Sequence, residues 1–334
     1  MTVSPDRAAE VYNGAIVIDA TAPMLVHDDE WPSWHRGGVT CAFATLTTSR
    51  SGANMPSTIG TIADWYVKLR THSDRLLHAT TVADIDRAKR EGKLAVVFHF
   101  QNATPIEFNL RLLEIYHRLG VRAIQLTYNV KNALGDGCLE RTDAGLSEFG
   151  VAAVKEMNRL GILVDLSHTG EQTTLDAMEA SSKPVAFTHA NVRTICEHRR
   201  NLSDRQMRKL AELDGVMGLN GFPPFVRPDT EAPTVDDLID HLDYIVKLIG
   251  IDHVGLGLDY FKAQPGEYEQ RLRTGEWKPG EYPKPPWNYP RGIDDASKLG
   301  ALAPALARRG YSDDDIVKVL GGNFLRVLRA VWGR

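Results

Sequence analysis

Short apolar stretches recur along the chain, and most are followed by a segment in which apolar residues return every three or four positions. The first pattern predicts buried β-strands and the second predicts amphipathic α-helices. Candidate strands occur at residues 15–21, 38–46, 93–101, 123–128, 163–168, 184–189, 215–220 and 253–260. Candidate helices lie between several of them, at residues 107–120, 150–161, 171–180 and 235–250.

Strands that are apolar on both faces and alternate with helices are typical of a parallel sheet covered by helices. Because eight such strands fit into 334 residues, we predict an α/β fold, a single (β/α)8 TIM barrel over residues 1–334. The alternative is an open doubly wound sheet. No GxGxxG turn follows the first strand to favour it.

Residues 261–292 depart from this rhythm, because they are rich in Pro, Gly, Tyr and Trp and have little periodicity. Long loops without regular structure are uncommon in a domain unless they are functional or disordered. This segment follows the eighth strand, so it would emerge where TIM barrels keep their active sites. We predict a lid or a dimer contact.

Composition narrows the class of protein. Hydrophobic residues are 43%, charged residues are 25% and the net charge is −4, which is typical of a globular protein and gives no basic surface for nucleic acid. The N-terminus lacks signal-peptide features and no apolar run approaches about 18 residues, so we expect a cytoplasmic protein without a membrane partner. Cys41, Cys138 and Cys196 lack the spacing of a disulfide framework or thiolate site.

Polar side chains end several of the predicted strands. His99 and Gln101 should point to the same side of their strand, because strand side chains alternate. Other strands end in Tyr128, His168, His189 and Asp259. Each histidine alone is compatible with a structural role, and an aspartate can cap a helix. Two histidines and an aspartate together can hold a divalent metal, which activates water for hydrolysis.

Four stretches, "EMNRLGILVDLSHTG" (156–170), "PVAFTHANVRTICEHRRNLSD" (184–204), "HLDYIVKLIGIDHVGLGLDY" (241–260) and "RGYSDDDIVKVLGGNFLRVL" (309–328), resemble the membrane (renal) dipeptidase family of zinc hydrolases. The resemblance implies a metal-dependent hydrolase barrel, usually dimeric, that cleaves dipeptides at a two-zinc site. It implies that His168 and His189 bind the second zinc and that Arg200 binds the substrate carboxylate. It also implies that Asp259 assists the nucleophilic water.

The chain departs from this family at the first metal site. Thr21 and Pro23 stand where the family has an HxD pair, and Gln101 stands where it has a bridging glutamate. Tyr128 replaces a histidine that contacts the substrate. Because a neutral carboxamide is a poor bridge between cations, we expect one divalent ion, zinc. The predicted ligands are His168, His189, His99, Gln101 and Asp259, although His99 could instead fill the space of the lost site.

These residues predict a hydrolase for an amide or peptide bond in a small, carboxylate-bearing, dipeptide-like substrate. Asp259 would be the base, Tyr128 would contact the substrate, and Arg200 would clamp its carboxylate. The alternatives are a lyase, isomerase or decarboxylase that uses Tyr128, His99 and Asp259 as acid and base, and a catalytically inactive homologue that binds a ligand. From the resemblance we expect a homodimer.

Overall fold

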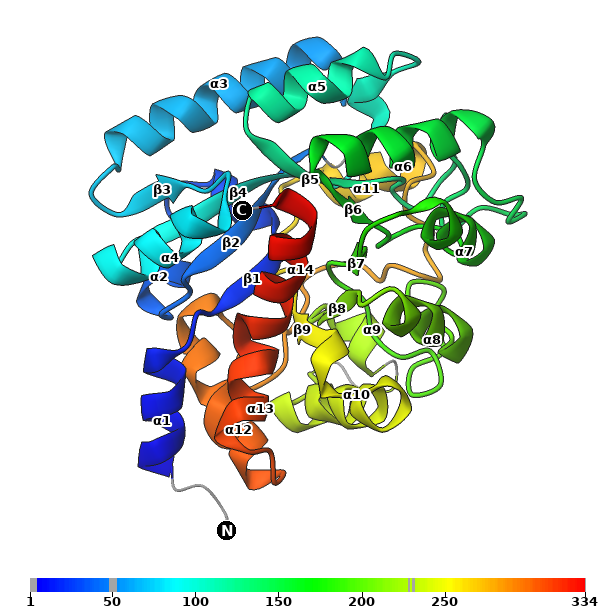
Figure 1. Ribbon diagram of the computed structural model, residues 1–334. Coiled ribbons are helices and arrows are strands. Elements are labelled where there is room, and N and C mark those ends of the chain that lie inside the picture. Colours follow the sequence, from blue (N-terminus) through cyan, green and yellow to red (C-terminus); the bar gives the residue numbers. More distant parts are fainter. Residues whose placement is uncertain (1–4, 48–52, 228, 230–231, 334) are drawn as a thin grey trace.

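The computed structural model describes residues 5–47, 53–227, 229 and 232–333. In this part of the chain the strands form one parallel sheet in the order β1-β2-β4-β5-β6-β7-β8-β9, with β3 paired to β4 (Figure 1). They are β1 (Ile18–Ala22), β2 (Cys41–Thr47), β3 (Leu76–His78), β4 (Leu94–Phe100), β5 (Val121–Gln125), β6 (Leu163–Asp165), β7 (Ala186–Phe187), β8 (Val216–Leu219) and β9 (Val254–Leu256). The eight predicted strands are present. β3 was not predicted, because three residues are too few to display a period.

The two ends of the sheet meet at β1 and β9. The backbone N–H of Asp259 donates to the carbonyl oxygen of Thr21 at 3.1 Å, and the backbone N–H of Leu258 donates to Asp19 Oδ1 at 2.9 Å. Burial raises the pKa of Asp19 to about 6, although hydrogen bonds from Trp34 and from the Leu258 backbone oppose the shift. The sheet therefore curls into a nearly closed barrel, which confirms the predicted TIM-barrel fold.

Helices surround the barrel (Figure 1). The four predicted helices are present as α5 (Arg111–Arg118), α6 (Glu148–Leu160), α7 (Glu171–Ala180) and α10 (Val235–Ile249), and Gly161 ends α6 in the left-handed conformation. The other helices in the described chain are α1 (Pro5–Gly14), α2 (Pro32–Arg36), α3 (Met55–Thr71), α4 (Val82–Glu91), α8 (Asp204–Glu212), α9 (Pro223–Val226), α11 (Glu267–Arg273), α12 (Leu302–Arg308), α13 (Asp313–Val317) and α14 (Asn323–Trp332).

The barrel interior is filled at one end and polar at the other. Ala95 and Val97 alternate along β4 and belong to the same buried cluster as Phe324 of α14. Gly255 makes room for this aromatic ring, because a Cβ atom there would lie 2.6 Å from Phe324 Cδ2. His99 follows Val97 by two residues, so polar side chains begin where the apolar filling ends.

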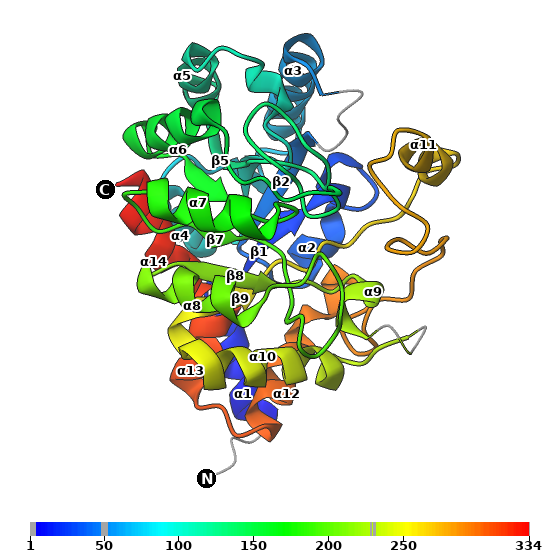
Figure 2. The same cartoon turned by 90° about the vertical axis from the view of Figure 1, so that its right-hand side faces the viewer.

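The 261–292 segment contains α11 and lies on the side of the molecule away from α14 (Figure 2). Its aromatic residues pack closely: the rings of Trp277 and Tyr282 are stacked with centroids 4.7 Å apart, and Trp287 packs against Phe222. Within the described residues no helix is long and apolar enough to cross a membrane.

Candidate active site

A small cavity of about 30 Å3 lies at the carboxyl ends of the strands, beneath the 261–292 segment. The cavity is large enough to hold water, since about 10–15 Å3 is enough for one molecule. Four predicted site residues line it, together with apolar and aromatic side chains from several loops. The lining residues are Pro23, Gln101, Tyr128, His168, Phe222, Phe225, Asp259, Phe261, Arg271, Trp277 and Tyr282.

His168 presents an unprotonated ring nitrogen at this cavity. Its Nδ1 lies 2.6 Å from Asn129 Oδ1. The amide nitrogen of Asn129 donates to the Glu276 carbonyl oxygen at 2.9 Å, so Oδ1 must face the imidazole and accept. The hydrogen is therefore on Nδ1. Nε2 is buried and has no hydrogen-bond partner among the described residues.

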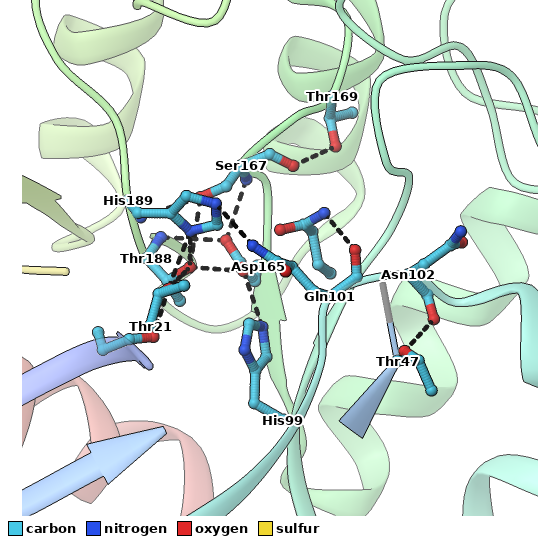
Figure 3. A network of polar contacts seen from close by, with 12 residues as sticks. Thr21, Thr47, His99, Gln101, Asn102, Asp165, Ser167, Thr169, Thr188 and His189 are labelled. Atoms are coloured by element: carbon cyan, nitrogen blue, oxygen red, sulfur yellow. Dashed lines mark hydrogen bonds and ion pairs between the residues drawn. The ribbon is translucent and has the colours of Figure 1, made fainter. Parts of the chain in front are cut away.

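His189 is held in the same tautomer by hydroxyl groups. Its Nδ1 lies 2.8 Å from Thr188 Oγ1 and 2.9 Å from Thr21 Oγ1. Because the Thr188 hydroxyl donates its hydrogen to Asp165, it accepts from Nδ1. The Nε2 atom lies 3.1 Å from the Gln101 amide nitrogen, which donates to it (Figure 3). The ring centroids of His168 and His189 are 4.9 Å apart.

His99 is directed elsewhere, contrary to our expectation that it joins His168 and His189. Its Nε2 lies 2.9 Å from Asp165 Oδ2, deeper in the barrel (Figure 3). Burial raises the pKa of Asp165, but the hydrogen bond and charge of His99 outweigh it, so this pKa is lowered. Alternation correctly places His99 and Gln101 inside the barrel. His99 comes two residues before Gln101 along the chain. The pair of His99 and Asp165 therefore lies one pleat deeper in the barrel than the cavity that Gln101 lines.

Asp259 lies in the cavity with a perturbed carboxyl group. Burial raises its pKa to about 7, although the positive charge of Arg200 opposes the shift. The Asn220 amide lies 3.4 Å from Asp259 Oδ2. His168 and Asp259 both have positive φ angles, 60° and 54°, which are strained for residues other than glycine. Backbone strain at two cavity residues supports a functional site here.

Tyr128 lines the same cavity, and Arg200 packs on Phe225, which also lines it. Arg200 is 2% exposed, its Nη2 donates to the His189 carbonyl oxygen at 3.0 Å, and its Nε has no hydrogen-bond partner in the described chain. Tyr128 stacks on His168 with ring centroids 4.1 Å apart. Burial raises the pKa of Tyr128 to about 12. Trp277 Nε1 donates to the Tyr128 oxygen at 3.2 Å, which leaves the phenol hydrogen free to donate.

Comparison with known proteins identifies the family. The profile described as membrane dipeptidase (Peptidase family M19) matches residues 30–273 and 286–332. The chain belongs to this family. Dipeptidase tcpJ of Claviceps purpurea is 31% identical over 79% of this chain, and dipeptidase aclJ of Aspergillus oryzae is 34% identical over 76%. These matches cover 57% and 56% of the two relatives, so the chain spans a little more than half their length.

A solved structure extends the likeness over nearly the whole chain. An amidohydrolase from Pseudomonas aeruginosa superposes with a TM-score of 0.88 and 32% identity, and the match covers 98% of this chain and 99% of that one. The two stretches matched by the dipeptidase profile leave out residues 274–285. Trp277 and Tyr282, which roof the cavity, lie in this gap.

The family is one of metallopeptidases, which implies a divalent metal ion. No three His, Cys, Asp or Glu side chains of the described residues are grouped to hold an ion. Within the described residues Asp259 and His99 are therefore not grouped with the two histidines, and the predicted ligand set stays a prediction. The unpartnered His168 Nε2 is the atom that best fits a metal. Thr21 hydrogen-bonds to His189 instead of serving as a ligand.

Some residues of the site were missed in the sequence. They include Asp165 and Asn129. Asp165 was the easier of the two to recognise, because a carboxylate inside an apolar strand must have hydrogen-bond partners when it is buried. Asn129 gave no signal, since its partners Glu276 and Tyr282 lie about 150 residues further along the chain. The predicted homodimer and cytoplasmic location stay predictions.

Proposed function

We propose that this chain hydrolyses the amide bond of a small, dipeptide-like substrate with a free carboxylate, using one divalent ion bound by His168 and His189. The observation that carries the proposal is the tautomer shared by the two rings. Each Nδ1 donates to an oxygen, so each Nε2 carries a lone pair: that of His168 has no partner among the described residues, and that of His189 accepts from the Gln101 amide. Histidines that bind metals are held in this way, with the other ring nitrogen donating to a fixed acceptor.

Gln101 is the proposed third protein ligand. Its amide nitrogen now donates to His189 Nε2, and rotation of the carboxamide would present the oxygen to an ion in the same place. Two imidazoles and an oxygen suit zinc. An ion held there would supply the Lewis acidity that amide hydrolysis at neutral pH requires.

The remaining side chains have complementary roles in this proposal. Asp259 accepts a proton from the attacking water, because its pKa of about 7 lies near the working pH of such a base. Tyr128 keeps its proton and donates a hydrogen bond to the substrate. The buried guanidinium of Arg200 pairs with the substrate carboxylate, which a planar fork of donors binds at two oxygens.

The base assignment predicts a pH profile. For a dipeptide substrate, kcat/KM should rise with pH and level off, with an apparent pKa at or below about 7, because a bound cation lowers the pKa of a nearby carboxyl group. Asp259→Asn should lose this rising limb and about 100-fold or more in rate. The measurement is kcat/KM from pH 5 to 9, with metal content checked at each pH. An identical rising limb in Asp259→Asn would assign it to another group.

The carboxylate clamp predicts substrate selectivity. Wild-type enzyme should cleave dipeptides with a free C-terminal carboxylate about 10- to 100-fold better, in kcat/KM, than the corresponding C-terminal amides. Arg200→Gln should raise KM for the free dipeptides and abolish the difference. Arg199→Gln is the matched control, because Arg199 donates to the carbonyl oxygens of Leu139 and Glu140 instead. No cleavage of any dipeptide by metal-loaded enzyme would contradict the proposed function.

A non-hydrolytic enzyme is the second candidate. The contact between the Gln101 amide and His189 Nε2 favours it, because this hydrogen bond satisfies the lone pair without an ion. Such an enzyme would use Asp259 and Tyr128 as base and acid on a carboxylate-bearing substrate. Metal content separates the two candidates.

A further inference from the structure

Asn129 joins the cavity to the segment above it. Its side chain is fully buried and makes two kinds of contact. Oδ1 accepts from His168 Nδ1 at 2.6 Å, whereas Nδ2 lies 2.9 Å from the Glu276 carbonyl oxygen and 3.0 Å from the Tyr282 hydroxyl. Glu276 and Tyr282 belong to residues 274–285, the stretch outside the dipeptidase profile.

These contacts are directional. A backbone carbonyl oxygen can only accept, so the carbonyl of Glu276 forces the Asn129 amide nitrogen toward itself and the amide oxygen toward His168. The imidazole then carries its hydrogen on Nδ1 and presents the Nε2 lone pair to the cavity. Without the Glu276 carbonyl, only the weak Cys138 thiol donor at 3.4 Å from Oδ1 would oppose, among the described residues, a turn of the amide that reverses the tautomer of His168.

A dipeptide-like substrate needs more room than the cavity has, and lifting residues 274–285 would provide it. The cavity of about 30 Å3 is far smaller than the several hundred Å3 of ordinary ligand pockets. Trp277 and Tyr282 line this cavity and stack on each other. When the stretch lifts, Asn129 loses the acceptor that orients its amide.

We propose that Asn129 is a positioning residue that holds His168 in its Nδ1-protonated tautomer only while residues 274–285 cover the cavity. The lone pair of His168 is thereby made available when the stretch is closed. The inference rests on the proposed function, in which His168 Nε2 binds the ion. Control of the His168 tautomer would then belong to residues 274–285, which the family profile does not match.

The test uses metal-free, substrate-free protein. It measures the tautomer of His168 and the closure of residues 274–285 in separate experiments. NMR of ¹⁵N-histidine-labelled protein reports the tautomer of His168, with its signals assigned by their loss in His168→Gln. Hydrogen–deuterium exchange reports the protection of residues 274–285. In the wild type we expect Nδ1 protonated, Nε2 unprotonated and the stretch protected.

Two substitutions of Asn129 separate its contacts. Asn129→Leu should give a mixture of His168 tautomers and about tenfold faster exchange in residues 274–285, because both contacts are lost. Asn129→Asp should keep Nδ1 protonated but speed the exchange equally, because a carboxylate cannot donate to the Glu276 carbonyl. An unchanged tautomer in Asn129→Leu, or unchanged exchange in either variant, would overturn the proposal. If Asn129→Leu does not fold, the exchange in Asn129→Asp and the Trp277 variant decide.

Trp277→Ala tests the coupling with Asn129 intact. Loss of the stack on Tyr282 should speed exchange of residues 274–285 and give the same mixture of His168 tautomers. Trp332→Ala is the control, since it removes an indole of α14 whose Nε1 donates to the Arg122 carbonyl oxygen, away from residues 274–285, and it should change neither readout. Unchanged exchange in Trp277→Ala, or faster exchange without a tautomer change, would refute the coupling. Because neither readout uses metal or turnover, failure of the hydrolase proposal is detected separately.

Discussion

Replacing His168 by alanine is expected to lower kcat/KM for a dipeptide about a thousandfold and to reduce bound metal from close to one equivalent per chain to none. The side chain offers a buried Nε2 atom with no partner among the described residues, so nothing in the described site replaces this ligand. Loss of Lewis acidity removes several kcal/mol of transition-state stabilisation, and each ~1.4 kcal/mol is tenfold in rate. Elemental analysis of dialysed protein and steady-state kinetics measure the two effects.

His99→Gln is the informative comparison for this experiment. His99 is also a buried histidine inside the barrel, but it pairs with Asp165. The variant should therefore retain close to one equivalent of metal while losing stability. Metal lost from His99→Gln but kept by His168→Ala would reverse the assignment of the ligands. Close to two equivalents in the wild type would contradict the one-ion proposal, and none after gentle purification would favour the non-hydrolytic enzyme.

Replacing Asp165 by asparagine is expected to reduce the free energy of unfolding by about 3–5 kcal/mol. The carboxylate accepts at Oδ1 from the backbone N–H groups of Ser167 and Thr188, and at Oδ2 from the Thr188 hydroxyl and His99. An amide has one acceptor oxygen, and its NH2 group would face two of these donors. Buried donors would then be left without acceptors. Urea unfolding at pH 7 with an unchanged m-value measures the loss.

The same carboxylate predicts the direction of the pH dependence of stability. Burial alone would raise the pKa of Asp165, yet the hydrogen bond and charge of His99 lower it in the folded protein. Its stabilisation is therefore present above the unfolded pKa of about 3.9 and is lost as pH falls below that value toward the folded pKa. The difference between wild type and Asp165→Asn should narrow in acid.

Asp143→Asn is the control for this stability measurement. Asp143 is an exposed carboxylate that accepts from the backbone N–H of Gln172 at 2.7 Å, and an asparagine oxygen can still accept there, so its substitution should change the free energy of unfolding by less than about 0.5 kcal/mol. A loss of less than about 1 kcal/mol in Asp165→Asn would show that the buried network tolerates an amide. In that case the tautomer of His189 would not depend on the carboxylate.

The architecture of this protein is encoded locally. A strand of the barrel is buried on both faces, so its apolar run is visible without knowledge of its neighbours, and a glycine such as Gly161 marks a helix end because the left-handed conformation is required there. β3 escaped prediction because it has only three residues. The strand ends that carry Tyr128, His168 and Asp259 could be located for the same reason, since parallel strands bring their carboxyl ends to one face.

The sequence by itself determined the barrel, the shared side of His99 and Gln101 on their strand, and the polar residues at the barrel mouth. Only the tertiary structure decided how deep each of these side chains lies in the barrel and which groups it contacts. His99 and Gln101 have the same inward orientation, yet one pairs with Asp165 and the other reaches His189. Alternation along a strand specifies a direction but not a position along the barrel axis, and hydrogen-bond partners come from segments distant in sequence. The Asn129 contacts with Glu276 and Tyr282 exist for that reason only in the folded chain.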